Sequence, residues 1–184
     1  LDPQKGSIEF LGKPIQRMEA DRIVRLGLSH VPEGREVFPF LSVRENLMMG
    51  AYLRRDRDGV AQDLERVYGY FPRLKERLGQ PAGQLSGGEQ QMLAIARAMI
   101  AKPDLIMLDE PSEGIMPVLV DEMFELFRSM KAQGTTVLLV EQNVELALGI
   151  ADRAYVLDQG AVVHQASARA LLADDEIKER YCSV

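Results

Sequence analysis

The sequence predicts an α/β fold in which a parallel sheet forms the core and a mostly helical subdomain is inserted into it. Short apolar segments, such as Leu105–Leu108 and Thr135–Val140, alternate with amphipathic helical segments in the second half of the chain. The segment Phe38–Gln84 instead has the pattern of charged helices. Continuous apolar strands between helices are typical of a parallel sheet that is buried on both faces. We therefore expect both faces of this sheet to be covered.

The chain begins with a predicted hairpin. Alternating residues in Ser7–Phe10 precede the turn-forming run Leu11–Pro14. Glu19–Leu26 then predicts a short helix, and Leu28–Val31 predicts a strand that a proline closes.

The inserted segment predicts two helices, over Ser42–Tyr52 and Gly59–Leu78. A loop is predicted between them at Arg54–Asp58, and the charged run Arg54–Arg57 within it is expected to be solvated.

Two longer amphipathic helices are predicted in the second half, over Gly88–Ala101 and Pro117–Ala132. Each carries apolar residues at core spacing, and a proline or glycine follows soon after its end. The remaining predicted elements are a helix, two strands around the turn Gln159–Gly160, and a helical tail: Val144–Ile150, Ala154–Leu157, Val162–His164, Ala168–Ala173 and Asp175–Tyr181.

Composition excludes several classes of protein. The net charge is -6, with 22 basic and 28 acidic residues, and this balance argues against a nucleic-acid partner, because phosphate backbones select clustered Lys and Arg. The single cysteine, Cys182, excludes an internal disulfide framework and favours a reducing compartment. No apolar run approaches the roughly 20 residues that span a bilayer, so a role at a membrane is expected to come through a partner.

Two adjacent carboxylates, Asp109 and Glu110, follow a predicted buried strand and precede Pro111. Ligands of open α/β sheets bind at the carboxyl ends of strands, and neighbouring strand residues point in opposite directions. One acid could then hold Mg²⁺ while the other orients an attacking water. An ordinary strand end with a solvated acidic turn is the equally weighted alternative. Glu141 and Asp158 also follow predicted strands.

A second feature is Leu85-Ser86-Gly87-Gly88-Glu89, where Ser86 and Glu89 have the spacing of a capping box. Two glycines leave the N–H groups of the following helix open to an anion such as a phosphate. The alternative is a plain helix cap in a flexible loop.

The run Leu85–Glu89 resembles the signature motif of ABC-type ATPases. The strand that ends in Asp109 and Glu110 resembles their Walker B segment. The resemblance implies a P-loop NTPase-like core and residue roles. Ser86, Gly87, Gly88 and Glu89 would form the signature turn and face ATP bound to the opposite subunit. Asp109 would support Mg²⁺, and Glu110 would polarise the attacking water. Ser112 and Gly114 fall where the family's D-loop lies, at the dimer interface.

The sequence departs from the family pattern in three places. The Walker A loop, G-x-x-x-x-G-K-[ST], is absent, since the pair Gly12-Lys13 lacks its other residues. We expect this loop to lie upstream of Leu1, so that the chain is truncated at its N-terminus and, by itself, inactive. Glu33 replaces the family's Q-loop glutamine and could still reach Mg²⁺. Gln142 replaces the switch histidine, and it could hydrogen-bond a γ-phosphate without carrying charge.

The resemblance also implies an organisation, partners and cargo. Residues 1–184 would be one ABC ATPase domain, with core strands and the Q-loop region in 1–37, a helical subdomain in 38–100, the Walker B core in 101–166 and a helical tail in 167–184. Partners would be a second ATPase subunit, membrane permease subunits and, indirectly, a substrate-binding protein, which places the chain on the cytoplasmic face of the membrane. The motifs look like those of branched-chain amino-acid importers.

Several alternatives remain open at this point. Importers of urea or short amides have similar motifs. An ABC ATPase that acts on nucleic acid or ribosomes would need coiled coils, a tandem unit or a basic surface, and none is seen in the sequence. A non-hydrolysing fragment or regulatory module would also lack Walker A.

Overall fold

The computed structural model describes residues 3 and 5–181. The first elements agree with the prediction from the sequence. Strands β1 (Glu9–Phe10) and β2 (Lys13–Pro14) form an antiparallel hairpin, and α1 (Ala20–Arg25) leads into β3 (Leu28–Val31). The pair Gly12-Lys13 therefore lies in and just after a hairpin turn, and no helix follows it directly.

The central sheet is parallel, with strand order β3-β4-β5, where β4 is Leu105–Asp109 and β5 is Thr136–Val140. Leu105 pairs with Leu28 on one side and with Thr136 on the other. The predicted adjacency of these two parallel strands is confirmed. The carboxyl ends of β4 and β5 consequently meet at one edge, next to Asp109.

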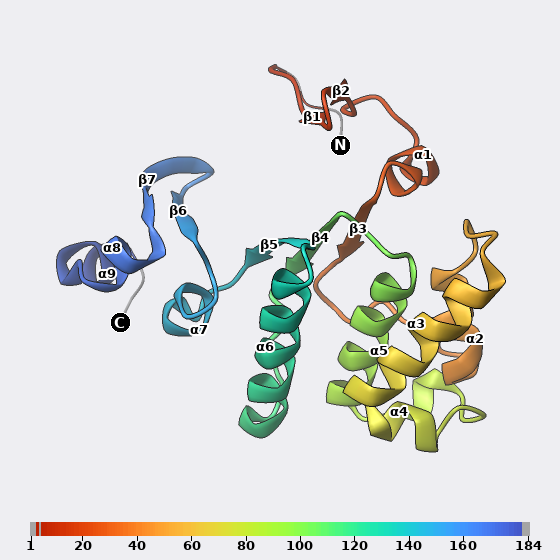
Figure 1. The fold of residues 1–184 in the computed structure, drawn as a ribbon. Coiled ribbons are helices and arrows are strands. Elements are labelled where there is room, and N and C mark those ends of the chain that lie inside the picture. The colour runs from red at the N-terminus through yellow and green to blue at the C-terminus, as the bar shows by residue number, and fades with distance from the viewer. Residues whose placement is uncertain (1–2, 4, 182–184) are drawn as a thin grey trace.

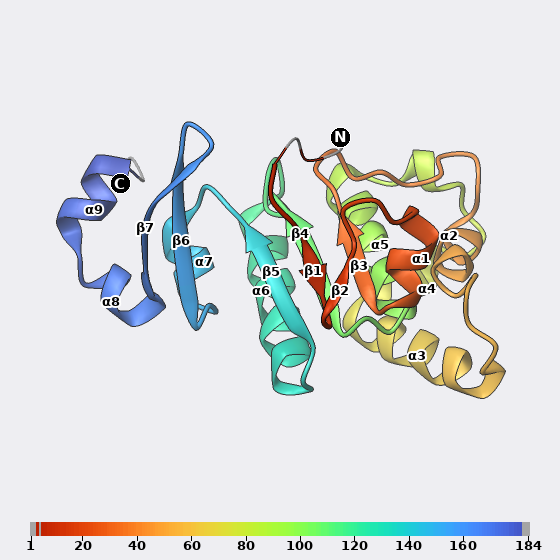
Figure 2. The same ribbon diagram turned by 90° about the horizontal axis from the view of Figure 1, so that it is seen from above.

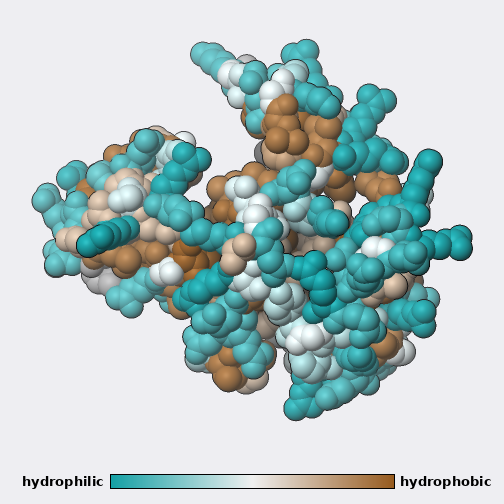
Figure 3. All heavy atoms as spheres, in the orientation of Figure 1, coloured by the Kyte–Doolittle hydropathy of each residue, from teal (hydrophilic) through white to brown (hydrophobic). Residues whose placement is uncertain are grey.

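The described helices cover only one face of this sheet. Helices α5 (Gly87–Ile100) and α6 (Pro117–Ala132) both lie on that side, where Ile106 and Leu108 are fully buried (Figure 1). Leu138 and Val140 point to the other side and remain 49% and 51% exposed. Apolar atoms are correspondingly visible above β4 and β5 (Figure 3). The expectation that both faces are covered is thus wrong for the described residues, because no described helix packs on the second face.

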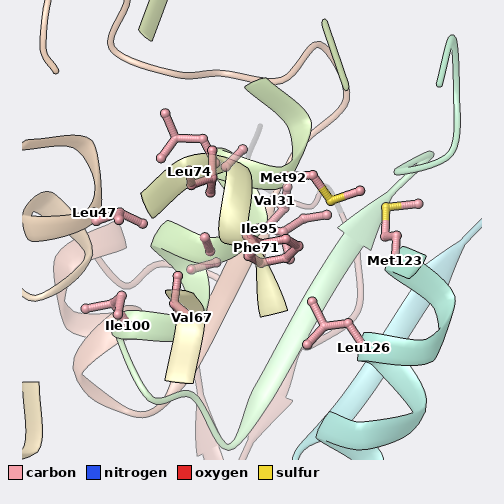
Figure 4. Close-up of a cluster of buried hydrophobic side chains, with 14 of the residues drawn as sticks. Val31, Leu47, Val67, Phe71, Leu74, Met92, Ile95, Ile100, Met123 and Leu126 are labelled. Atoms are coloured by element: carbon pink, nitrogen blue, oxygen red, sulfur yellow. The ribbon is translucent and has the colours of Figure 1, made fainter. Parts of the chain in front are cut away.

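The inserted segment forms a compact helical layer around α5. It consists of α2 (Val43–Gly50), α3 (Arg57–Tyr70), α4 (Pro72–Glu76) and the short 3-10 helix η1 (Ala82–Gln84). Buried side chains from these helices meet those of α5, and Met123 and Leu126 of α6 lie nearby (Figure 4). This shared core fixes the start of α5 relative to the sheet.

The single helix predicted over Gly59–Leu78 is in fact two. The chain breaks at Phe71, whose φ of -125° and ψ of 70° are not helical. Pro72 follows and explains the break, because a proline disfavours the helical conformation of the residue before it and supplies no N–H of its own. Helix α4 then starts with Pro72 at its first position.

Arg54 corrects a second expectation, since it is not part of a solvated loop. Its Nη1 donates to Asp63 Oδ2 at 2.6 Å and to the Ile100 carbonyl at 2.7 Å, and its Nη2 donates to Asp56. The hydrogen bonds to Asp56 and Asp63 raise the pKa of Arg54 despite its partial burial. Arg54 thus joins α3 to the carboxyl end of α5.

The C-terminal elements form a separate antiparallel pair rather than an extension of the parallel sheet. After α7 (Val144–Leu148), β6 (Arg153–Asp158) pairs with β7 (Ala161–Ser167), followed by α8 (Ala168–Leu172) and α9 (Asp175–Tyr181) (Figure 2). Asp158 therefore ends a hairpin strand and does not share the edge with Asp109. Cys182 lies outside the described residues. Among those residues, no helix has the length and apolar character that a bilayer crossing needs.

Candidate functional site

The turn before α5 is held by the predicted capping box. Ser86 Oγ accepts from the Glu89 backbone N–H, and Glu89 Oε2 accepts from the Ser86 N–H at 2.9 Å. Arg77 Nε lies 3.3 Å from Glu89 Oε1. Burial raises the pKa of Glu89, but the hydrogen bonds from Ser86 and the charge of Arg77 outweigh it and leave the pKa below its usual value. The ionised Glu89 thus fixes the turn and faces the positive end of the helix.

The two glycines of this turn lie under side chains from other segments. A Cβ on Gly88 would lie 2.7 Å from Leu119 Cδ1 of α6, and a Cβ on Gly87 would lie 2.6 Å from Arg35 Cζ. A larger residue at either position would force the neighbouring Arg35 or Leu119 side chain to move. The glycines therefore let these two side chains pack directly on the backbone at the start of α5.

The edge of the sheet brings Glu110 and Gln142 together. Asp109 pairs with Val140 at the end of β4, and the Glu110 N–H donates to the Val140 carbonyl at 2.9 Å. Glu110 has a φ of 44°, which is uncommon for a residue other than glycine. Its side chain accepts a 2.8 Å hydrogen bond from Gln142 Nε2. This bond orients the carboxylate and uses only one of its two oxygens.

Glu141 ties the loop after Glu110 to the end of β5. Its Oε1 accepts from the Ser112 N–H at 3.0 Å. Ser112 and Gly114 therefore lie in a loop that is anchored to the same edge as Gln142. The sequence flagged Glu141 only as an acid after a strand, and its partner could not be read from the pattern.

Glu33 lies apart from these pairs, on the exposed linker 32–41 between β3 and α2. No hydrogen bond or ion pair joins it to another residue of the described ranges. Within those ranges, no group of three or more His, Cys, Asp or Glu could hold a metal ion without further ligands. The carboxylate oxygens of Asp109 and Glu110 do fit a hard cation such as Mg²⁺, which is commonly bound by one or two carboxylates together with substrate phosphates.

Three residues that the sequence did not single out hold the linker. Arg97 Nη2 donates to the Glu36 carbonyl at 2.5 Å, and Asn46, which is fully buried, hydrogen-bonds both backbone groups of Phe38. Arg35 packs on Gly87. Burial lowers the pKa of Arg97, opposed by the charge of Glu36. None of the three has a sequence signal beyond its position in the linker or in a helix.

Comparison with known proteins identifies relatives. Residues 1–113 match a family model described as "ABC transporter". The chain is 46% identical over 176 residues to the high-affinity branched-chain amino acid transport ATP-binding protein BraG of Pseudomonas aeruginosa, covering 96% of this chain and 75% of that protein. It is 35% identical over 178 residues to the probable branched-chain amino acid transport ATP-binding protein LivF of Archaeoglobus fulgidus, with the same coverage.

Solved structures support the fold. The ADP conformation of an ATP-binding cassette from an ABC transporter matches with a TM-score of 0.79 and 23% identity, covering 100% of this chain and 79% of that chain. At this identity the likeness shows the architecture alone. It confirms the predicted P-loop NTPase-like α/β core.

Proposed function

This chain belongs to the ABC transporter family, and we propose that it binds and hydrolyses ATP to power the uptake of branched-chain amino acids. It is an ATP-binding subunit of a transporter, as its family and relatives establish. Hydrolysis, the cargo and the residue roles are the proposed part. The names of the relatives BraG and LivF support the choice of cargo.

The hydrogen bond between Gln142 and Glu110 is the observation that supports the proposed hydrolysis of ATP. A general base must be fixed within reach of the water that it activates. The 2.8 Å bond from Gln142 Nε2 to Glu110 Oε1 fixes the carboxylate and leaves its second oxygen for water. Since an amide is not basic, Gln142 orients Glu110 without competing with it for the proton of the water. We assign Glu110 as the general base and Gln142 as the residue that holds it.

The nucleotide site is proposed around the same edge. Mg²⁺, when bound with ATP, would neutralise the developing charge on the phosphates. Asp109, at the end of β4, would hold this ion, and Glu33 on the linker could reach it directly or through water. The Ser86–Gly88 turn with Glu89, together with Ser112 and Gly114, would meet a nucleotide held by a second ATPase subunit.

Membrane partners are proposed from the surface of α2 and the linker before it. Phe40 and Tyr52 are 96% and 78% exposed, and Met48 and Met49 lie exposed between them in sequence. Large apolar side chains exposed along one short segment make that segment a candidate interaction site. We propose that permease subunits bind here, at the cytoplasmic face of the membrane, and that a substrate-binding protein acts through them. We also propose the division into 1–37, 38–100, 101–166 and 167–184.

Residues 1–184 by themselves are proposed to bind ATP weakly. The sequence contains no G-x-x-x-x-G-K-[ST], so it has no backbone cradle and lysine for the β- and γ-phosphates. Each lost charge-assisted hydrogen bond is worth about 1.5–3 kcal/mol. Calorimetry with ATP and Mg²⁺ is expected to give no micromolar binding, and a micromolar Kd would contradict this proposal.

Uptake by the assembled transporter tests the proposed cargo. Vesicles that contain the complete subunit with its permeases and binding protein should accumulate labelled leucine when ATP is enclosed on the subunit's side. Urea and a short amide, supplied at the same concentration, serve as matched competitors. Uptake of urea or the amide without uptake of leucine would replace the cargo assignment, and ATP consumption without any uptake would remove it.

A further inference from the structure

Arg35 lies where three segments of the chain meet. It belongs to the linker between β3 and α2, and its guanidinium packs on Gly87, the first residue of α5. A Cβ on Gly87 would lie 2.6 Å from Cζ and 3.0 Å from Nη2 of Arg35. A Cβ on Gly114, in the loop after β4, would lie 3.2 Å from the same Nη2. The guanidinium therefore spans the backbones of Gly87 and Gly114, two glycines that are far apart in sequence.

The linker on either side of Arg35 is attached to different parts of the molecule. From Glu36 onward it is tied to the helical layer, because Arg97 of α5 binds the Glu36 carbonyl and Asn46 of α2 binds Phe38. Its other end continues from β3 of the sheet. Gly87 belongs to the helical layer and Gly114 follows the sheet, so Arg35 lies at the joint between the two.

The backbone around Arg35 is strained. Arg35 and Glu36 have φ angles of 69° and 23°, a region that residues other than glycine seldom adopt. Such conformations persist where the surroundings fix them, and they cluster at functional sites. Within the described ranges, no hydrogen bond or ion pair engages the Arg35 side chain. Its contact with the two glycines is therefore packing of a flat group on backbone.

We infer that Arg35 is a positioning residue that sets the spacing between the Ser86–Gly88 turn and the Ser112–Gly114 loop. The inference rests on the proposed function, in which both segments meet a nucleotide held by the second subunit. A nucleotide contacts both at the lowest conformational cost when their separation is set before the subunits close. The flat guanidinium supplies that spacing, and a lysine, which has no planar group, does not.

The test uses the complete subunit with its partner ATPase subunit, on a Glu110→Gln background that is expected to keep the ATP-bound dimer. Sedimentation is followed while ATP and Mg²⁺ are titrated. Arg35→Ala and Arg35→Lys should each raise the ATP concentration for half-maximal dimer formation by about 10-fold, which corresponds to about 1.4 kcal/mol. ATP affinity of the separate subunit should stay within about 2-fold of the parent. Arg55→Ala, an exposed arginine on the same layer, is the matched control.

The possible results separate the inference from the proposed function. The inference is overturned if Arg35→Ala forms the dimer at the same ATP concentration as the parent. It is also overturned if Arg35→Lys behaves like the parent, because the charge of residue 35 would then be sufficient for dimer formation. If the Glu110→Gln parent forms no ATP-dependent dimer, the proposed function fails and the inference falls with it.

A double-mutant cycle tests the contact itself without relying on nucleotide. Gly87→Ala forces the Arg35 guanidinium to move, because the new Cβ would lie 2.6 Å from its Cζ, so it should leave the Tm unchanged or lower it when Arg35 is present. In the Arg35→Ala protein the same change should have little effect or a small stabilising one, since alanine favours a helix more than glycine does. Equal effects of Gly87→Ala in both proteins would show that the two residues are not in contact, and would overturn the inference.

Discussion

Replacing Glu110 by glutamine should slow ATP hydrolysis by about 10²-fold or more, as the loss of a positioned base does. The amide oxygen of the new side chain can still accept the hydrogen bond from Gln142 Nε2, so the shape of the edge is kept. Only the charge and basicity of the group are lost. ATP binding should survive, because the phosphates are held by other residues, and the ATP-bound dimer should accumulate.

Phosphate release and gel filtration with ATP and Mg²⁺ measure the two effects of this change in the complete subunit. Asp109→Asn is the matched comparison one residue earlier, and it should weaken Mg²⁺-dependent nucleotide binding instead. Gln142→Ala should remove the bond that orients Glu110 and lower the rate of hydrolysis by about 10-fold, near the lower value for a hydrogen bond to a charged group. Hydrolysis by Glu110→Gln at the parent rate would move the general-base role to Glu33 or Glu141.

The strands and long helices could be predicted from the sequence because their signals are local. Helix α6 runs from Pro117 to Ala132 as predicted, since a proline is favoured at the first position and Gly134 follows its end. The capping box of Ser86 and Glu89 is similarly a matter of spacing within one turn. These features depend on neighbours in sequence, and they located half of the candidate site.

The parts that were missed depend on contacts between distant segments. The pairing of Gln142 with Glu110 joins residues 32 apart, and its geometry follows from the loops after two different strands. Arg54 reaches the Ile100 carbonyl, 46 residues away, so its charged neighbours gave the wrong expectation of a solvated loop. The uncovered face of the sheet could not be foreseen either, because an apolar strand has the same pattern whether or not a helix covers it.

Asn46 belongs to no sequence motif, but it holds the linker that carries Glu33 and Arg35. Its replacement should destabilise the protein. The side chain is fully buried. Its Oδ1 accepts from the Phe38 N–H at 2.9 Å, and its Nδ2 lies 3.0–3.2 Å from the carbonyls of Phe38, Leu41 and Ser42. Asn46→Leu keeps a side chain of similar size but leaves the Phe38 N–H without its acceptor, whereas the three carbonyls keep backbone donors. An unsatisfied buried group costs about 1–3 kcal/mol, so we expect the free energy of unfolding to fall by an amount in that range.

Leu47→Ala provides the control, because Leu47 is the next residue of α2 and is also fully buried. Its loss should cost about 2–5 kcal/mol through a cavity, while the hydrogen bonds to the linker remain. Urea denaturation measures both losses, and amide hydrogen exchange at Phe38 separates them. In Asn46→Leu, exchange at the Phe38 amide should accelerate more than the loss of global stability accounts for. In Leu47→Ala, it should accelerate only by the amount that the loss of global stability accounts for. A loss below about 1 kcal/mol in Asn46→Leu, the net worth of a single hydrogen bond, would mean that the linker carrying Glu33 and Arg35 is held by other contacts.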